Sequence, residues 1–394
     1  MAMKISSRKL QSPILIPSSK SYAARMLLVG AMSENRYSVA DIPKSQDSIE
    51  LIEVLKNLGI GYRDGDRFVL DKSFPKDETP SDQPVVLNLG EGGTTIRFLL
   101  SLLSLGRNKY LLKVHPRFKL RPFAEQLELL KSLGAQIVES EKEDELCTLQ
   151  GPIKLPKSLT IDCSKTTQVT SSFLILAHFN NCKIKVKNLN SSAAYIEMTK
   201  NVLSSIKADQ SVPVDMSSTS SFLALASIFQ DLEFPQILAA DPLQADSTII
   251  SILESSGASI EFSPHLKIKK SILSPFNVDG SKCLDLIPNL CFLASHIKGR
   301  SRIYNIKNLK HKESDRVEGI CQVLDQVGVN YKIDDNSIEI EGPYKINSLE
   351  KIETLADHRI VMLASLFLKI CGGGEVTNSN TVAKSNSNFF ELLN

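Results

Sequence analysis

The sequence lacks the residue spacings from which metal sites and disulfide frameworks are built. Its seven cysteines are odd in number and include no Cys-x-x-Cys pair, and its six histidines include no His-x-x-x-His pair. Free thiols in a reducing compartment account for such cysteines better than disulfides or a zinc site do. We therefore expect a cytoplasmic protein without a metal site.

Long hydrophobic runs and an excess of charge of one sign are also missing. No apolar run approaches the roughly 18 residues that a membrane span needs, and the first residues lack the apolar segment of a secretory signal. The 46 basic and 44 acidic side chains leave a net charge of +2, which gives no indication of a nucleic acid or a membrane surface as the main partner. We expect small molecules as ligands.

The chain does have the length and the apolar content for more than one core. It has 394 residues, of which 42% are hydrophobic and 23% charged, a balance typical of a globular protein. Because one domain usually holds roughly 100–200 residues, this length predicts two domains.

A pattern of apolar helix, short strand and amphipathic helix occurs six times along the chain. The second repeat, for example, reads TTIRFLLSLLSL, KYLLKV and RPFAEQLELLKSLGAQIV. The first helix of each repeat is apolar on nearly all sides and is predicted to be buried. The second helix has spaced apolar positions and is predicted to cover a core from outside. Six repeats in two groups of three predict two α/β domains, each with buried helices walled by sheets.

Polar and cationic residues gather where these helices begin. Serine, threonine and aspartate are preferred N-caps there, but cations beside a buried helix are costly unless they have partners. If the helix starts face a shared cleft, their N–H groups and dipoles favour anions, and arginine adds bidentate recognition of phosphates and carboxylates. The cations expected there are Lys20, Arg25, Arg97, Arg121, Lys312, Arg316, Arg359 and Lys384.

Several ordered motifs carry a family resemblance. PSSKSYAAR resembles Pro-Gly-Ser-Lys-Ser-x-x-x-Arg, GEGGTTIRF resembles Gly-Asn-x-Gly-Thr-x-x-Arg, and HKESDR with LADHR resembles Lys-Glu-Ser/Thr-Asp-Arg with Asp-His-Arg. With SKTTQ, SSAAYIEMT and DMSSTSSF, they make the chain similar to the 5-enolpyruvylshikimate-3-phosphate synthase (3-phosphoshikimate 1-carboxyvinyltransferase) family from about Pro17 to Phe390.

The resemblance implies a fold and a reaction. The fold is a two-domain inside-out α/β barrel (an inverse α/β prism) with three helix-strand-helix-strand repeats per domain and the active site in the interdomain cleft. The implied domains are 18–212, and 1–17 plus 213–394. The implied reaction transfers the enolpyruvyl group of phosphoenolpyruvate to the 5-hydroxyl of shikimate 3-phosphate and releases phosphate, in the shikimate pathway. It proceeds by addition and elimination, needs no cofactor, and is carried out by a monomer in most of the family.

The resemblance also assigns roles to residues. It implies catalytic roles for Glu313, Lys20, Asn289 and Lys384. The residues implied to bind shikimate 3-phosphate are Lys20, Ser21, Arg25, Thr166, Thr167, Gln168, Ser192, Tyr195, Asn289, Asn308 and Lys312. The residues implied to bind phosphoenolpyruvate are Lys20, Gly93, Thr94, Arg121, Gln168, Arg316, Arg359 and Lys384.

Smaller expectations concern neighbouring polar residues. Arg97 should brace the loop around Gly93, Asp215 and Asp357 should cap helices, and His358 should orient its neighbours. A purely structural alternative pairs Glu313 or Asp315 with Lys310 or Arg316 along one helix.

The chain departs from the family pattern at several positions. Asn289 stands where relatives have an aspartate that is often assigned as the base for the 5-hydroxyl, and an amide cannot take that proton. Glu91 replaces an asparagine near the phosphoenolpyruvate site and would repel an anion unless a cation intervenes. The stretch from Val202 to Asp215 is too short for the strand pair that normally closes the third repeat, which predicts a thinner sheet there.

Three functions are therefore compared. The favoured one is an active synthase, because nearly every anion-binding position is present. The second is a catalytically impaired homologue that binds shikimate 3-phosphate, suggested by Asn289 and Glu91. The third is a UDP-N-acetylglucosamine enolpyruvyl transferase, which ranks last because that family uses a cysteine ahead of the arginine corresponding to Arg121, and no cysteine precedes Cys147.

Overall fold

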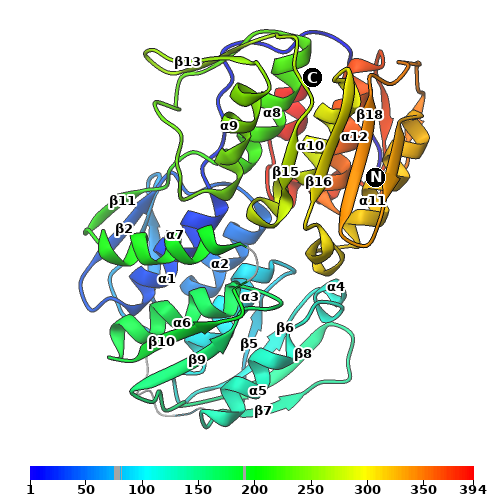
Figure 1. Ribbon diagram of the computed structural model, residues 1–394. Coiled ribbons are helices and arrows are strands. Elements are labelled where there is room, and N and C mark those ends of the chain that lie inside the picture. Colours follow the sequence, from blue (N-terminus) through cyan, green and yellow to red (C-terminus); the bar gives the residue numbers. More distant parts are fainter. Residues whose placement is uncertain (75–79, 81, 190–191) are drawn as a thin grey trace. The chain divides into compact units, whose positions relative to one another are not determined.

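The computed structural model describes residues 1–74, 80, 82–189 and 192–394. The chain divides into two compact units (Figure 1). Unit N is Ser18–Pro213, and unit C is Met1–Pro17 together with Val214–Asn394. Within the described ranges, no helix is both long enough and apolar enough to span a membrane.

Unit N is built around three helices that the sequence predicts to be buried. These are α1 (Lys20–Met32), α3 (Gly93–Leu103) and α6 (Gln168–Phe179), which pack against one another. Nearly all residues of α1 and α3 are buried because their apolar side chains point in every direction. The outer helices are α2 (Gln46–Asn57), α5 (Ala124–Ser132) and α7 (Ala193–Ser204), with the short α4 (Pro116–Lys119) before α5.

Three sheets cover the buried helices in the described part of unit N. The first has the order β11-β2-β4-β3, with bounds β2 (Tyr37–Ala40), β3 (Gly61–Asp64), β4 (Arg67–Leu70) and β11 (Asp209–Ser211). The second has the order β5-β6-β8-β7, with bounds β5 (Val85–Asn88), β6 (Lys109–Lys113), β7 (Gln136–Glu139) and β8 (Glu145–Gln150). The third pairs only β9 (Ser158–Asp162) with β10 (Lys183–Lys187).

The short stretch after α7 explains the two-stranded third sheet. The single strand β11 follows α7, and it pairs in parallel with β2 of the first repeat rather than with β10. The prediction of a thinner sheet in the third repeat is therefore confirmed, and β11 links the last repeat of unit N to its first.

Unit C repeats this arrangement around α8 (Met216–Phe229), α10 (Ile287–His296) and α12 (His358–Ile370). Helix α12 is buried from His358 to Lys369. The outer elements are the 3-10 helix η1 (Ala245–Ser247) with α9 (Thr248–Ser255), then η4 (Lys307–His311) with α11 (Arg316–Val327), and η5 (Ser379–Lys384) with α13 (Phe389–Leu393). Two further 3-10 helices, η2 (Gly280–Lys282) and η3 (Leu284–Leu286), precede α10.

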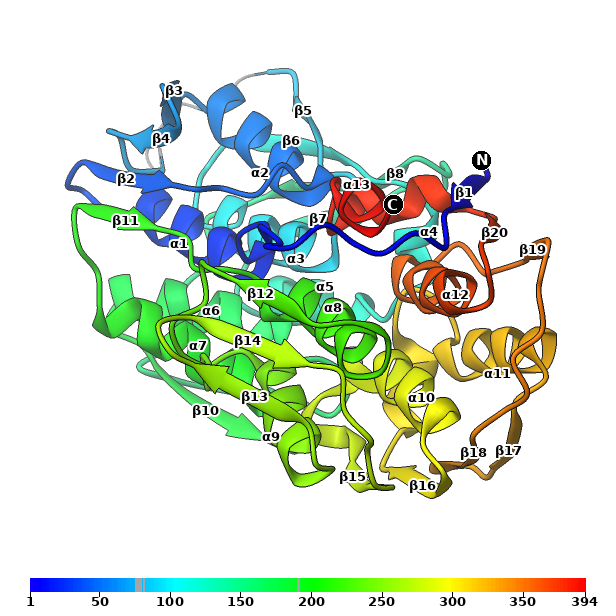
Figure 2. The same cartoon turned by 90° about the horizontal axis from the view of Figure 1, so that it is seen from above.

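The sheets of unit C include the N-terminal strand. One sheet has the order β12-β14-β13, with bounds β12 (Leu232–Phe234), β13 (Ser259–Phe262) and β14 (Leu266–Lys269). Another has the order β15-β16-β18-β17, with bounds β15 (Asn277–Asp279), β16 (Gly299–Tyr304), β17 (Asn330–Ile333) and β18 (Ser337–Gly342). In the last, β1 (Met3–Ile5) pairs antiparallel with β20 (Gly374–Val376), which also pairs with β19 (Lys351–Ile352), as Figure 2 shows. This pairing explains why residues 1–17 belong to unit C.

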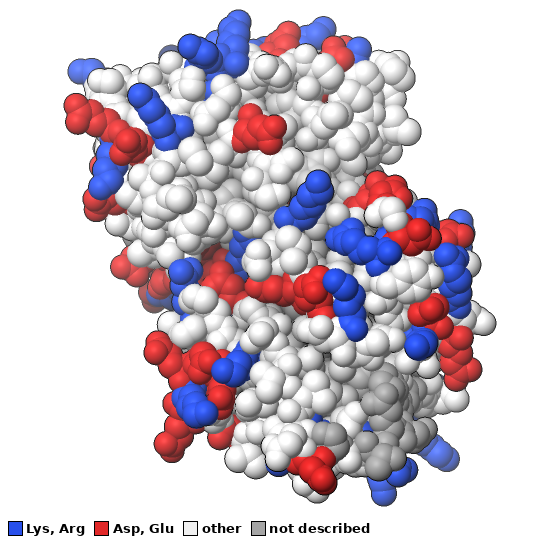
Figure 3. All heavy atoms as spheres, turned by 180° about the vertical axis from the view of Figure 1, so that it is seen from behind, with Lys and Arg blue, Asp and Glu red and all other residues white. Residues whose placement is uncertain are grey.

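The predicted mixed α/β, two-domain fold is confirmed. On the face shown in Figure 3, basic and acidic side chains are interspersed and broad areas carry neither. The chain divides after Pro17 and after Pro213, and the assignment of 18–212 and 1–17 plus 213–394 as two three-repeat domains stays a prediction.

Candidate functional site

Lys20 begins helix α1 in unit N and is held by a carboxylate that no sequence motif indicates. Its Nζ lies 2.9 Å from Oδ2 of Asp47, which is only 4% exposed and sits in the first turn of α2. Gly92 packs so closely here that a Cβ on it would lie 2.6 Å from Cγ of Asp47. From the sequence alone, an acid in the motif SQDS is typical of an N-terminal first turn and does not indicate a partner for Lys20.

Arg25 is buried inside unit N, where four hydrogen bonds fix its guanidinium. Nε donates to Oγ1 of Thr199 at 2.8 Å, Nη1 donates to the Ser21 carbonyl at 2.8 Å, and Nη2 donates to Oγ of Ser171 and to the Tyr195 carbonyl. Burial lowers the pKa of Arg25 to about 10, so the group stays charged at neutral pH. Arg25 therefore ties α1 to α6 and α7.

Arg97 braces the loop around Gly93, as the sequence analysis predicts. Nη1 donates to the Gly93 carbonyl at 3.1 Å and to Oε1 of Gln168 at 2.8 Å, while Nη2 donates to the Pro122 carbonyl at 2.8 Å. Gln168 in turn donates from Nε2 to Oγ1 of Thr94 at 2.9 Å. This network brings three predicted substrate-binding residues, Gly93, Thr94 and Gln168, together in unit N.

Arg121 lies against Gly93, and no carboxylate among the described residues forms an ion pair with it. A Cβ on Gly93 would lie 2.7 Å from Nη1 of Arg121, and the buried Nε of Arg121 has no hydrogen-bond partner among the described residues. Burial is the main cause that lowers the pKa of Arg97, and repulsion from Arg121 adds to it, so that this pKa is about 9. Two guanidinium groups that repel each other in this way favour an anion beside Gly93.

Glu91 is matched by two basic groups from the same unit. One oxygen of Glu91 lies 3.5 Å from Nδ1 of His115 and 3.9 Å from Nη1 of Arg117. The repulsion that Glu91 would exert on an anion is therefore partly offset by the guanidinium of Arg117, which follows β6.

The remaining predicted residues of unit N lie at helix starts. Thr167 is the N-cap residue of α6, and Oγ1 of Thr166 accepts from the backbone N–H of Gln168 at 3.2 Å. Ser192 is the N-cap residue of α7, with φ at 58°, and Tyr195 lies in the first turn of that helix. Helix N-termini of this kind favour anions.

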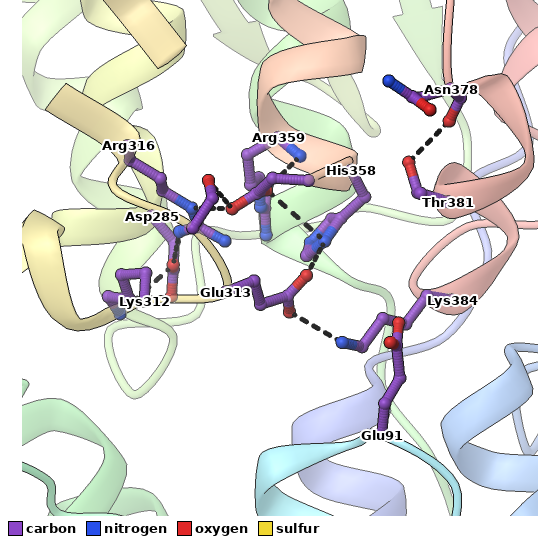
Figure 4. Close-up of polar contacts among 12 residues, drawn as sticks. Glu91, Asp285, Lys312, Glu313, Arg316, His358, Arg359, Asn378, Thr381 and Lys384 are labelled. Atoms are coloured by element: carbon purple, nitrogen blue, oxygen red, sulfur yellow. Dashed lines mark hydrogen bonds and ion pairs between the residues drawn. The ribbon is translucent and has the colours of Figure 1, made fainter. Parts of the chain in front are cut away.

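In unit C, Glu313 joins a histidine and a lysine that are distant in the sequence. Oε2 of Glu313 lies 2.9 Å from Nδ1 of His358, and Oε1 lies 3.3 Å from Nζ of Lys384 (Figure 4). Burial alone would raise the pKa of Glu313, but His358, Lys384 and Arg316 outweigh it and hold this pKa well below the usual range. Burial lowers the pKa of His358 despite the carboxylate beside it.

The purely structural pairing of Glu313 along a helix is wrong. Helix α11 begins only at Arg316, so Glu313 precedes it and pairs with residues from α12 and η5 instead. Asp315 is the N-cap, and its Oδ1 accepts from the backbone N–H groups of Val317 and Glu318.

Arg316 is a buried guanidinium between two carboxylates. It is 2% exposed, with Nε 2.8 Å from Oδ2 of Asp357 and Nη1 2.5 Å from Oδ1 of Asp285. Lys312 reaches the same oxygen of Asp285 at 3.3 Å. Asp357 caps α12 by accepting from the backbone N–H of Arg359, and Asp215 caps α8 by accepting from that of Ser218; both predicted caps are confirmed.

Asn289 is buried in the first turn of α10 and bonded to α8. Its Nδ2 donates to Oγ of Ser220 at 2.8 Å, and its Oδ1 accepts from Oγ of Ser221 at 3.3 Å. Asn308 lies on η4, ahead of Lys312. The described structure thus brings Glu313, Lys384, Arg316 and Lys312 into one charged network, whereas Asn289 belongs to the packing of α8 on α10.

Three side chains of this network have the spacing of a metal site. Oxygen and nitrogen atoms of Glu313, Asp357 and His358 lie within 4.8 Å of one another. Lys384 and Arg316 already pair with these carboxylates. Because their positive charges would oppose a divalent cation, the network is better suited to anions.

The chain matches known proteins along almost its whole length. The family model of EPSP synthase (3-phosphoshikimate 1-carboxyvinyltransferase) matches residues 5–210 and 205–393. A 3-phosphoshikimate 1-carboxyvinyltransferase from Pyrococcus abyssi is 30% identical over 97% of this chain and 94% of its own, and one from Vibrio cholerae is 29% identical over 89% and 88%.

Solved structures share the fold at lower identity. The EPSP synthase of Acinetobacter baumannii is 20% identical and superposes with a TM-score of 0.76 over 99% of this chain and 97% of that one. The enolpyruvyl transferase NikO of Streptomyces tendae is 12% identical with a TM-score of 0.74, over 100% of this chain and 96% of that one. With the motifs, the repeats and the nearly full-length match together, the chain belongs to the EPSP synthase (3-phosphoshikimate 1-carboxyvinyltransferase) family.

Proposed function

We propose that the chain transfers the enolpyruvyl group of phosphoenolpyruvate to the 5-hydroxyl of shikimate 3-phosphate and releases inorganic phosphate. The observation that carries this proposal is the partly buried Glu313 carboxylate, which lies between His358 and Lys384 and close to Arg316. An acid–base group surrounded by cations suits a reaction in which anionic substrates exchange protons.

In the addition step the 5-hydroxyl loses its proton to a base as its oxygen bonds to C2 of phosphoenolpyruvate, and the methylene carbon accepts a proton from an acid. Elimination then breaks the bond from C2 to the phosphate oxygen and returns a methyl proton to a base. Glu313 is ionised in the protein without substrate. When phosphate and carboxylate groups neutralise Lys384 and Arg316, the pKa of Glu313 rises, so the carboxylate can take up and then deliver this proton.

The two units supply the binding groups. In unit N, Arg121 with Gly93, Thr94 and Gln168 forms one anion-binding group, and Lys20, held by Asp47, supplies a further cation. In unit C, Arg316 pairs with Asp357 and Lys384 pairs with Glu313, while Arg359 lies 3.9 Å from Asp246. For shikimate 3-phosphate we propose Lys20, Ser21, Arg25, Thr166, Thr167, Gln168, Ser192, Tyr195, Asn289, Asn308 and Lys312.

The direct test is phosphate release from phosphoenolpyruvate with and without shikimate 3-phosphate. Release that depends on shikimate 3-phosphate supports the synthase. A thermal shift with shikimate 3-phosphate but no release by the unmodified chain indicates the impaired binding homologue. A shift with a UDP-amino sugar alone favours the sister transferase. A monomer in the cytoplasm is the proposed working form.

Asn289→Asp tests whether the amide limits the rate. The variant places a carboxylate beside Ser220 and Ser221, and if this group is the missing base, we expect kcat to rise by about 10²-fold, the lower end of general-base catalysis. We also expect the variant to be less stable than the wild type. Nδ2 of Asn289 donates to Ser220, and the Ser220 hydroxyl already donates to the Ser217 carbonyl at 2.7 Å, so the new carboxylate replaces a donor and gains none from Ser220. Urea unfolding should show a loss of about 1–3 kcal/mol. An unchanged kcat would mean that proton removal uses another group.

Gly93→Ala tests the anion-binding group of unit N. The new Cβ would lie 2.7 Å from Nη1 of Arg121, so the guanidinium must move. We expect the KM for phosphoenolpyruvate to rise by about tenfold, because a bidentate arginine contact depends on its geometry. The KM for shikimate 3-phosphate serves as the internal comparison. An equal rise in both values would indicate a general disturbance of α3.

A further inference from the structure

Asp246 is a buried carboxylate of unit C to which the proposed reaction gives no role. It lies on η1 and is 3% exposed. Its Oδ2 accepts a hydrogen bond from the hydroxyl of Ser217, whereas its buried Oδ1 has no hydrogen-bond partner in the part of the chain that the structure describes. A buried carboxylate oxygen without a donor is costly, and this cost points to a function.

The same serine holds Arg359. Nη2 of Arg359 donates to Oγ of Ser217, and Nη1 donates to the Ser217 carbonyl at 3.3 Å. Nη2 also lies 3.9 Å from Oδ2 of Asp246. Arg359 is in the first turn of α12 and Ser217 in the first turn of α8, so this contact fixes a guanidinium between two helix N-termini.

We propose that Asp246 is a positioning residue that holds Arg359 against the first turn of α8 through Ser217, and that the charge on Asp246 sets how tightly Arg359 binds an anion. This inference rests on the proposed function, in which that anion is phosphoenolpyruvate. Asp246 acts through Ser217 and Arg359 and does not contact the substrate.

Four groups face Asp246 and determine when it is charged. Arg359 comes from α12, Asp285 from η3, Asp215 from the start of α8 and the Cys283 thiol from the turn before η3. Burial raises the pKa of Asp246 to about 6 against the opposite pull of Arg359.

Binding of an anion and protonation of Asp246 are therefore linked. An anion on Arg359 weakens the attraction that keeps Asp246 ionised, so it favours the protonated acid. By reciprocity, the protonated acid favours the anion. Affinity is highest below the pKa of Asp246 and falls as the pH rises through about 6.

Asp246→Asn removes the charge and keeps an acceptor for Ser217. The readout is the KM for phosphoenolpyruvate from pH 5 to pH 8.5, given as the ratio of wild type to variant at each pH. Substrate phosphates also titrate near pH 6, but the ratio cancels that effect. We expect the KM ratio to be near 1 at pH 5 and to rise to about 3–10 above pH 7, while kcat stays nearly constant. The negative charge on wild-type Asp246, several ångströms from the bound anion, weakens anion binding by roughly this factor.

Two further variants complete the test. Ser217→Ala removes the hydroxyl between Asp246 and Arg359 and should raise the KM about 3- to 10-fold, the loss of one charged hydrogen bond. Glu254→Gln on the exposed face of α9 is the matched control and should leave the KM at the wild-type value at every pH. If Asp246→Asn does not fold, calorimetry in two buffers should show more proton uptake on phosphoenolpyruvate binding by the wild type than by Ser217→Ala.

The two proposals fail in different ways. Absence of shikimate 3-phosphate-dependent release by the wild type overturns the proposed function. The ratio of wild type to Asp246→Asn is then taken from dissociation constants of phosphoenolpyruvate measured by calorimetry. A ratio that does not change with pH, or equal proton uptake by wild type and Ser217→Ala, overturns the role of Asp246 even if the enzyme is active.

Discussion

Glu313→Gln is expected to slow phosphate release by about 10²–10⁴-fold, the usual contribution of a general acid–base group. The amide has nearly the same shape and can still contact Nδ1 of His358 and Nζ of Lys384, which lie 2.9 and 3.3 Å from the carboxylate. It cannot carry the proton to and from the methylene carbon. The KM values should change little, and single-turnover kinetics should place the loss in the chemical step.

Glu318→Gln is the matched control for this experiment. Glu318 is an exposed glutamate in the first turn of α11, near Glu313 in the sequence. We expect its kcat to stay within about twofold of the wild type, since exposed surface changes have small effects. If Glu313→Gln instead raised KM and left kcat unchanged, Glu313 would be a binding residue and another group would have to move the proton.

Arg316→Met is expected to reduce the free energy of unfolding of unit C by about 3–5 kcal/mol. The change removes the guanidinium that lies 2.5 Å from Asp285 and 2.8 Å from Asp357. Fully buried Asp357 loses its arginine, whereas Asp285 still pairs with Lys312 at 3.3 Å. Burial would raise the pKa of Asp357, but attraction by Arg316 outweighs it and holds this pKa low. Urea unfolding followed by circular dichroism measures the loss.

Two comparisons separate this effect from a general loss of charge. Arg300→Met removes an arginine of the same unit that is 54% exposed and lies 3.3 Å from Glu339, so it should cost at most about 1 kcal/mol. Adding Asp285→Asn to Arg316→Met should recover part of the stability, because one of the two carboxylates that Arg316 bridges is removed. A loss below about 1 kcal/mol for Arg316→Met would mean that water reaches the two carboxylates.

The sequence was sufficient to predict the repeats because each buried helix is apolar on all sides and each outer helix on one. That pattern is local and depends on the side chains of single helices such as α3 and α11. The helix caps Asp215 and Asp357 were predictable for the same reason, since a cap bonds to backbone atoms two or three residues away.

The partners of the charged groups were not predictable in this way. Arg25 bonds to Thr199, which is 174 residues away, and Lys20 pairs with Asp47 across two helices. The sequence alone does not distinguish a buried arginine that joins helices from an arginine that binds a substrate. Only the fold shows that Arg25 is held by four protein groups while Arg121 has a buried Nε without a hydrogen-bond partner among the described residues.

The pairing of β1 with β20 has a consequence for the order in which the protein folds during synthesis. All of unit N, from Ser18 to Pro213, leaves the ribosome before most of unit C has been made. Strand β1 must wait unpaired until Gly374–Val376 emerges, after the whole of unit N has been made. Unit N can thus fold while unit C is still being made, whereas unit C completes the sheet of β1, β20 and β19 only after Gly374–Val376 has emerged. Deletion of either β1 or β20 should therefore damage the same unit, the one that carries Glu313.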